Sequence, residues 1–121
     1  MTDMIPDTHE QIDRHLLFGR PSQRVSGSLI SKLSQLVADI QPVREAYLPE
    51  VKELGLAMPA SLAFFLVVDP PSRIEQVRRQ IDRKIGDILP VDLAVAVRVI
   101  TPDYPLLQTI RDTRCVVGWR D

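Results

Sequence analysis

Cys115 carries the only thiol of this 121-residue chain. A cysteine becomes reactive when nearby positive charge favours its thiolate, and Arg111 and Arg114 lie close to it in the sequence. No base stands beside it in a recognisable catalytic motif. We therefore interpret Cys115 as a small buried residue of a tail strand. A ligand-binding protein or a thiol-dependent enzyme using Cys115 is kept as the alternative.

A second candidate is a cationic group on the segment that follows Pro71. This group could meet an acidic protein partner or a phosphate, and its members are Arg73, Arg78, Arg79, Arg83 and Lys84. Glu75, Asp82 and Asp87 are interspersed with it, as on an ordinary solvated helix face, and we favour that interpretation. The chain carries a net charge of −1 and no aromatic residues alternate with these cations, so we predict no nucleic-acid partner.

The remaining polar residues give no sign of catalysis. His9 and His15 are six residues apart and do not match an i, i+4 metal pair. Glu45, Glu50 and Glu53 alternate with Arg44 and Lys52, which is typical of a solvated surface. The sequence also lacks a glycine-rich phosphate loop, a nucleophile elbow and a Cys-x-x-Cys pair. We expect no metal, no cofactor and no catalytic residue, and favour a protein that is not an enzyme.

These residues must be positioned by a fold whose centre is the segment Ala60–Asp69, ASLAFFLVVD. Its length, its aromatic residues and the prolines on both sides favour a β-strand over a buried helix. Strand side chains alternate, so Phe64 and Leu66 point to one face while Phe65 and Val67 point to the other. Both faces are apolar, so both need cover.

We predict one domain, because 121 residues with 45% hydrophobic content suffice for a single core. Residues 1–21 are expected to form an arm and a short helix over His9–Phe18, and residues 22–121 the domain. Apolar periodicity and proline breaks predict the other elements. Three helices are predicted: Ser28–Gln41, a helix that starts with a capping box at Ser72 and Glu75 and runs to Leu89, and Thr101–Asp112. The predicted strands are Val43–Val51, Ala60–Asp69, Leu93–Ile100 and a short tail strand in Cys115–Trp119.

The order predicts an α/β (α+β) domain, α-(α)-β-β-α-β-α, with a small mixed sheet of three to four strands. A hairpin and a strand–helix–strand crossover should place two helices on one face. Pro49 lacks an amide donor, so its strand is expected at or near an edge of the sheet. The second face would be covered by the N-terminal helix, the C-terminal tail or another subunit.

Uncovered apolar residues suggest an interaction or regulatory module that self-associates as a homo-oligomer. The residues expected in such contacts are Phe65, Val67, Tyr47 and Trp119, with Arg78, Arg79 and Arg83 for an acidic partner. The chain has no apolar run near the about 20 residues of a membrane span, so we predict no membrane partner. A single cysteine excludes an intramolecular disulfide, and Met1–Asp13 is not a signal peptide; both indicate a cytoplasmic protein.

Four phrases resemble the C-terminal domain of the enhanced serine sensitivity protein. These are Leu17–Pro21 (apolar-x-Gly-x-Pro), Val43–Leu48 (Val-x-x-Ala-Tyr-Leu), Pro59–Val68 (without the family's His and Gly) and Ile88–Asp92 (a shortened Leu-Pro-x-x-x-Val-Asp). The similarity covers Leu17 to Tyr104. At 121 residues we expect no room for the family's usual N-terminal domain, and Arg114–Trp119 stands in place of the expected Pro-Phe-Tyr ending. The resemblance implies a mixed α/β domain and assigns no catalytic residue.

Overall fold

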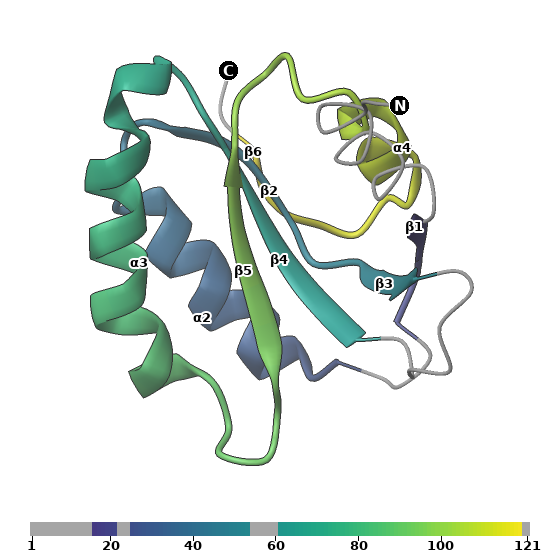
Figure 1. Ribbon diagram of the computed structural model, residues 1–121. Helices are drawn as coiled ribbons and strands as arrows, with labels where there is room; N and C mark the ends of the chain where they lie inside the picture. The colour runs from purple at the N-terminus through teal and green to yellow at the C-terminus, as the bar shows by residue number, and fades with distance from the viewer. Residues whose placement is uncertain (1–15, 22–24, 54–60, 120–121) are drawn as a thin grey trace, which may run out of the picture.

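A computed structural model describes residues 16–21, 25–53 and 61–119 of the chain. This part forms a mixed sheet with two layers of helix (Figure 1). The elements in chain order are β1 (Leu16–Gly19), α2 (Gly27–Ala38), β2 (Val43–Tyr47), β3 (Glu50–Glu53), β4 (Ser61–Val68), the 3₁₀ turn η1 (Pro71–Arg73), α3 (Ile74–Ile88), β5 (Val95–Ile100), α4 (Leu107–Asp112) and β6 (Val116–Trp119).

β4 is the central strand of the sheet. On one side it pairs in parallel with β5, to which the α3 crossover connects it. On the other side it pairs antiparallel with β2 and then with β3. β6 and β1 add a further antiparallel strand to β2 and β3 respectively. The predicted hairpin and crossover are confirmed, and β1, β3 and β6 make the sheet larger than the predicted three to four strands.

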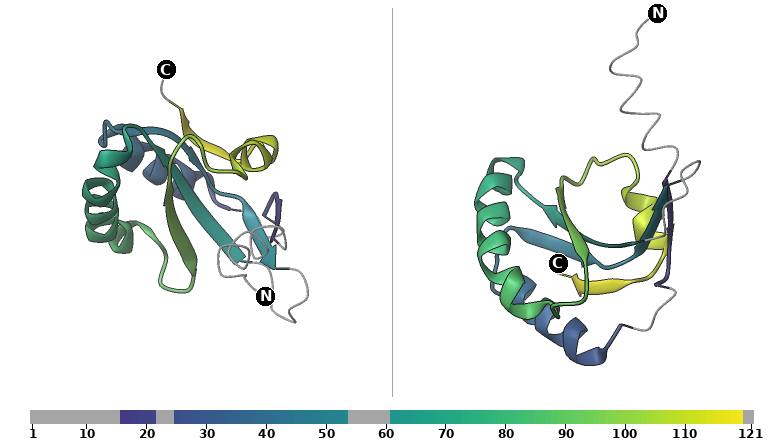
Figure 2. Two further views of the ribbon diagram at one scale, coloured as in Figure 1. Left: turned by 45° about the horizontal axis from the view of Figure 1, so that its top comes forward. Right: turned by 60° about the horizontal axis from the view of Figure 1, so that its bottom comes forward.

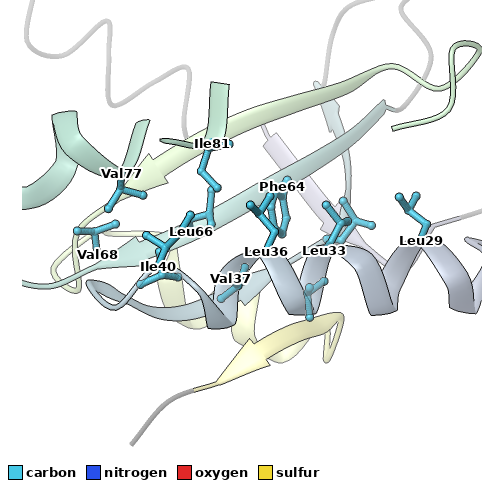
Figure 3. Packing of buried hydrophobic residues seen from close by; sticks show 14 residues of the cluster. Leu29, Leu33, Leu36, Val37, Ile40, Phe64, Leu66, Val68, Val77 and Ile81 are labelled. Atoms are coloured by element: carbon cyan, nitrogen blue, oxygen red, sulfur yellow. The ribbon is translucent and has the colours of Figure 1, made fainter. Parts of the chain in front are cut away.

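Helices α2 and α3 cover one face of the sheet, as the sequence predicts (Figure 1). α2 begins at Ser26, whose hydroxyl accepts a 3.1 Å hydrogen bond from the Leu29 amide. Its buried stripe meets Phe64, Leu66 and Val68 of β4 and two residues of α3 (Figure 3). The helix residues in this core are Leu29, Leu33, Leu36, Val37, Val77 and Ile81.

Helix α4 covers the centre of the other face. Leu107 and Ile110 of α4 pack on Tyr47, Phe65 and Val67, and all five side chains are buried. Phe18 of β1 approaches the Phe65 ring edge-on, with centroids 5.8 Å apart. Figure 2 shows α4 across the sheet from α2 and α3. The central strand is thus covered on both faces within one chain, and the second cover is a short helix that the sequence did not predict for this role.

Three helix predictions are wrong in their local details. The predicted helix His9–Phe18 lies mostly outside the described residues, but its last part, from Leu16, is strand β1. The capping box at Ser72 does not form, because Pro71–Arg73 make a 3₁₀ turn and neither η1 nor α3 has a side-chain cap. The last helix begins at Leu107, since the residues after Pro102 are turns.

The strand predicted over Val43–Val51 is split by Pro49. Pro49 lies between β2 and β3, so it withdraws no amide from either ladder, while its carbonyl accepts a 3.1 Å hydrogen bond from Ala63. β2 has partners on both sides and is not an edge strand. The prediction that the strand of Pro49 lies at an edge of the sheet is wrong, because Pro49 lies in the gap between two strands and not inside one.

A β-bulge in β2 decides which residues face α4. Val43 pairs with Val68 and Glu45 with Val67, so Arg44 is an extra residue in β2. Regular alternation would put Val43 and Glu45 on the same face. Instead Val43 joins the core under α2 and α3, and Tyr47 joins the core under α4. Arg44 is left exposed.

Candidate functional site

A buried carboxylate lies beneath α4. The side chain of Glu45 is 8% exposed, and it is held by two residues. Arg111 donates from Nε to Oε1 at 2.8 Å and from Nη2 to Oε2 at 2.7 Å. The Tyr47 hydroxyl donates to Oε1 at 2.5 Å. All three of these hydrogen bonds donate to the Glu45 carboxylate, so they favour its ionised form.

The Glu45 cluster joins α4 to the sheet. Glu45 and Tyr47 are two residues apart on β2 and share a face, while Arg111 follows Ile110 on α4. A six-residue helix has too few internal hydrogen bonds to persist alone. We conclude that the two-pronged Arg111 contact and the packing of Leu107 and Ile110 hold α4 in place.

The pKa values of the cluster follow from these contacts. The hydrogen bonds from Arg111, the largest cause, hold the pKa of Glu45 below its ordinary value against the opposing effect of burial. Burial and the Glu45 carboxylate raise the pKa of Tyr47. The hydrogen bonds to Glu45 raise the pKa of Arg111. Glu45 is therefore an anion and Arg111 a cation at neutral pH.

Because the pKa of Glu45 is lowered, the free energy of unfolding should depend on pH in the acid range. A carboxyl group whose folded pKa is depressed stabilises the protein above its unfolded pKa, here about 4.5. That contribution is lost as the pH falls through the folded pKa. We expect the free energy of unfolding of the wild-type to drop more steeply below pH 4.5 than that of Glu45→Gln. Urea unfolding at a series of pH values measures this, and parallel curves would contradict it.

The prediction that Glu45 belongs to a solvated acidic surface is wrong. Alternation along β2 could have placed Glu45 on the same face as Tyr47, because the two are two residues apart. The partner Arg111 lies 66 residues away, and no local pattern indicates it. All three members are bound to one another, so the cluster is a structural clasp that fastens α4 to the sheet.

Strand β6 presents an apolar edge beside this clasp. Trp119 pairs with Glu45 and Val116 with Tyr47, so both point to the α4 face. They are 60% and 48% exposed. The register between β2 and β6 shifts between Ala46 and Tyr47, so Val117 and Gly118 both turn to the opposite side. Val117 is buried there, and a Cβ added at Gly118 would meet Cγ1 of Val37 at 3.1 Å. We call Val116 and Trp119 the β6 edge. In the described part of the chain no further strand pairs beyond β6.

The structure separates the residues predicted to make intermolecular contacts. Phe65, Val67 and Tyr47 are 5%, 0% and 1% exposed within a single chain, because α4 lies over them. Another subunit is therefore not needed to cover them. Trp119 alone among the four predicted apolar contacts remains on the surface.

The exposed face of α3 carries four members of the predicted cationic group, and the fifth, Arg73, closes η1 just before it. Arg78 forms an ion pair with Glu75 at 3.1 Å, and Arg79 donates to the Glu75 carbonyl at 3.4 Å. Both arginines and Arg83 are exposed. The arginines and their interspersed acids form a mixed, solvated helix face, in keeping with the interpretation favoured from the sequence.

Cys115 lies between α4 and β6 and is half-buried. Its thiol is 3.5 Å from the Thr113 carbonyl, and its own carbonyl accepts a 2.9 Å hydrogen bond from the Leu48 amide. Arg111, predicted as one of its activating charges, is bound to Glu45 instead. Arg114, the other predicted charge, directly precedes Cys115 and has a positive φ of 58°. The prediction that Cys115 is buried within a tail strand is wrong in detail, because Cys115 is half-buried and lies just before β6.

No protein-family model, curated protein or solved structure matches this chain. The described helices include none that is long and apolar enough to cross a membrane. Among the described residues, no group of three or more His, Cys, Asp or Glu side chains could hold a metal ion. The class that the fold defines is a mixed α+β domain with a six-stranded sheet.

Proposed function

We propose that this chain is a non-enzymatic interaction module that self-associates through the β6 edge. The observation that carries the proposal is the exposure of Trp119 beside Val116 on an outer strand. Tryptophan is the residue most enriched in binding hot spots, and an outer strand offers backbone groups for pairing. Phe65, Val67 and Tyr47 are covered within the chain, so the proposed contact surface is the β6 edge and does not include them.

A second copy of the chain is the partner that fits this edge. Two β6 strands can pair antiparallel about a two-fold axis so that Trp119 of one lies opposite Val116 of the other. Aromatic and β-branched residues form favourable cross-strand pairs. β6 has the sequence VVGW and no charge, so the contact brings no like charges together within the strands. The two sheets would become one continuous sheet.

Trp119 is the only tryptophan, so its fluorescence reports directly on this edge. We expect its emission to shift to shorter wavelength with rising protein concentration, in step with dimer formation in sedimentation equilibrium. Trp119→Ala should weaken the dimer by roughly 30-fold or more, the cost of losing a hot spot of about 2 kcal/mol.

Val91→Ser is the matched control, because Val91 is fully exposed in the turn before β5 and should not affect association. A wild-type protein that stays monomeric at all concentrations would overturn self-association. A dimer that Trp119→Ala leaves intact would overturn the choice of β6.

On its sequence phrases alone, we also propose that the chain resembles the C-terminal domain of the enhanced serine sensitivity protein. The support is the agreement of Val43–Leu48 with that family's strand phrase. A solved structure of a family member that superimposes β2, β4, α3 and β5 in the same order would test it. A different strand order would remove it.

A further inference from the structure

A groove of about 590 Å³ opens where β4 ends. Its walls come from the C-terminal end of α2, the start of β2, the end of β4 and the beginning of α3, and a 3.1 Å hydrogen bond from the Asp69 amide to the Pro42 carbonyl joins two of them. Its charged residues are Asp39, Arg44, Asp69 and Arg73, and its neutral polar residues are Gln41, Gln76 and Gln80.

The four charged residues each have a structural reason to reach the groove. Arg44 is the extra residue of the β2 bulge, and bulges often re-aim a side chain in this way. Asp39 ends α2, Asp69 follows β4, and Arg73 closes η1 just before α3. The bulge that turns Glu45 toward α4 therefore also supplies a cation to the groove.

These charges do not neutralise one another. Within the described ranges, the side chains of Asp39, Arg44 and Asp69 form no ion pair or hydrogen bond, and Arg73 donates to Gln76 at 2.8 Å. A simple anion in the groove would face two carboxylates, and a simple cation would face two guanidinium groups. A ligand with both charges could satisfy both pairs.

We infer that this groove binds a small zwitterion, a molecule with a carboxylate and an ammonium group separated by a short polar backbone. Arg44 and Arg73 take the carboxylate, and Asp39 and Asp69 take the ammonium group. The volume accommodates a molecule about the size of a dipeptide, since small-molecule sites span roughly 300–1,000 Å³. The glutamine amides provide additional hydrogen-bonding groups along the walls.

The test is an NMR titration of the ¹⁵N-labelled full chain with dialanine, N-acetyl-dialanine and dialanine amide. The acetyl group removes the positive charge and the amide removes the negative charge, while the backbone is kept. We expect dialanine to shift the amide signals of residues around Asp39–Arg44 and Asp69–Arg73. Each singly charged derivative should bind about tenfold more weakly or worse, because it loses the charged hydrogen bonds at one end of the molecule.

Arg44→Gln and Asp69→Asn should each weaken dialanine binding by about tenfold. Arg83→Gln removes the same charge as Arg44→Gln from the exposed face of α3 and should change nothing. The Trp119→Ala protein should bind dialanine normally, so failure of the β6 proposal leaves this one standing. No binding, equal binding of either derivative, or binding that survives both groove variants would overturn the inference.

Discussion

Phe65→Ala should lower the free energy of unfolding by about 3–5 kcal/mol, because it leaves a cavity between β4 and α4. Phe65 is 5% exposed and contacts the Phe18 ring and the core of Leu107 and Ile110. Urea unfolding at a concentration where the protein is monomeric measures this loss. A loss of this size in the monomer would show that the residues covering Phe65 belong to its own chain.

The contrast between Phe65 and Trp119 makes this prediction specific. Phe65→Ala should reduce stability without weakening association of the molecules that remain folded, whereas Trp119→Ala should weaken association with little loss of monomer stability. Phe65→Leu is the matched control and should recover much of the loss, since it refills most of the cavity. A Phe65→Ala protein as stable as the wild-type monomer would contradict the position of α4.

Arg111→Ala should destabilise the fold by about 2–3 kcal/mol, because it leaves the Glu45 carboxylate buried without its cation. Breaking a fully buried pair costs about 3–5 kcal/mol, and we expect less here because the Arg111 side chain is 36% exposed. Replacing both residues in Glu45→Met/Arg111→Met should recover part of the loss. The coupling energy between them comes from a double-mutant cycle in urea unfolding.

Arg78→Ala is the matched control for Arg111→Ala. Its ion pair with Glu75 joins side chains that are 50% and 68% exposed, so its loss should cost less than about 1 kcal/mol. If Arg111→Ala cost no more than Arg78→Ala, the Glu45 cluster would not hold α4. The pH dependence expected of Glu45 would then also disappear.

The elements with strong local patterns could be predicted from the sequence. The doubly apolar run at β4 required a central strand with two covered faces, and the spacing of apolar residues in α2 placed its buried stripe. The alternation of Val95, Val97 and Val99 predicts that they share one face of their strand, and in the structure all three pack against the core under α2 and α3. In each case the periodicity of the side chains follows directly from the periodicity of the backbone.

The candidate site depends on features that no local pattern contains. The bulge at Arg44 shifts the face of every residue before it relative to those after it, and its position is set by pairing with β4. The contact between Glu45 and Arg111 depends on where the chain brings α4 back across the sheet. Sequence reasoning therefore found that a second cover was needed but could not identify α4 as that cover.

The most direct test of this account is an isotope-filtered NOE experiment on an equal mixture of labelled and unlabelled protein. We expect NOEs between the Ile110 methyl groups and the Phe65 ring within one chain and none between chains. Intermolecular NOEs between Ile110 and Phe65 would contradict it, because α4 would then cover the sheet of a neighbouring molecule.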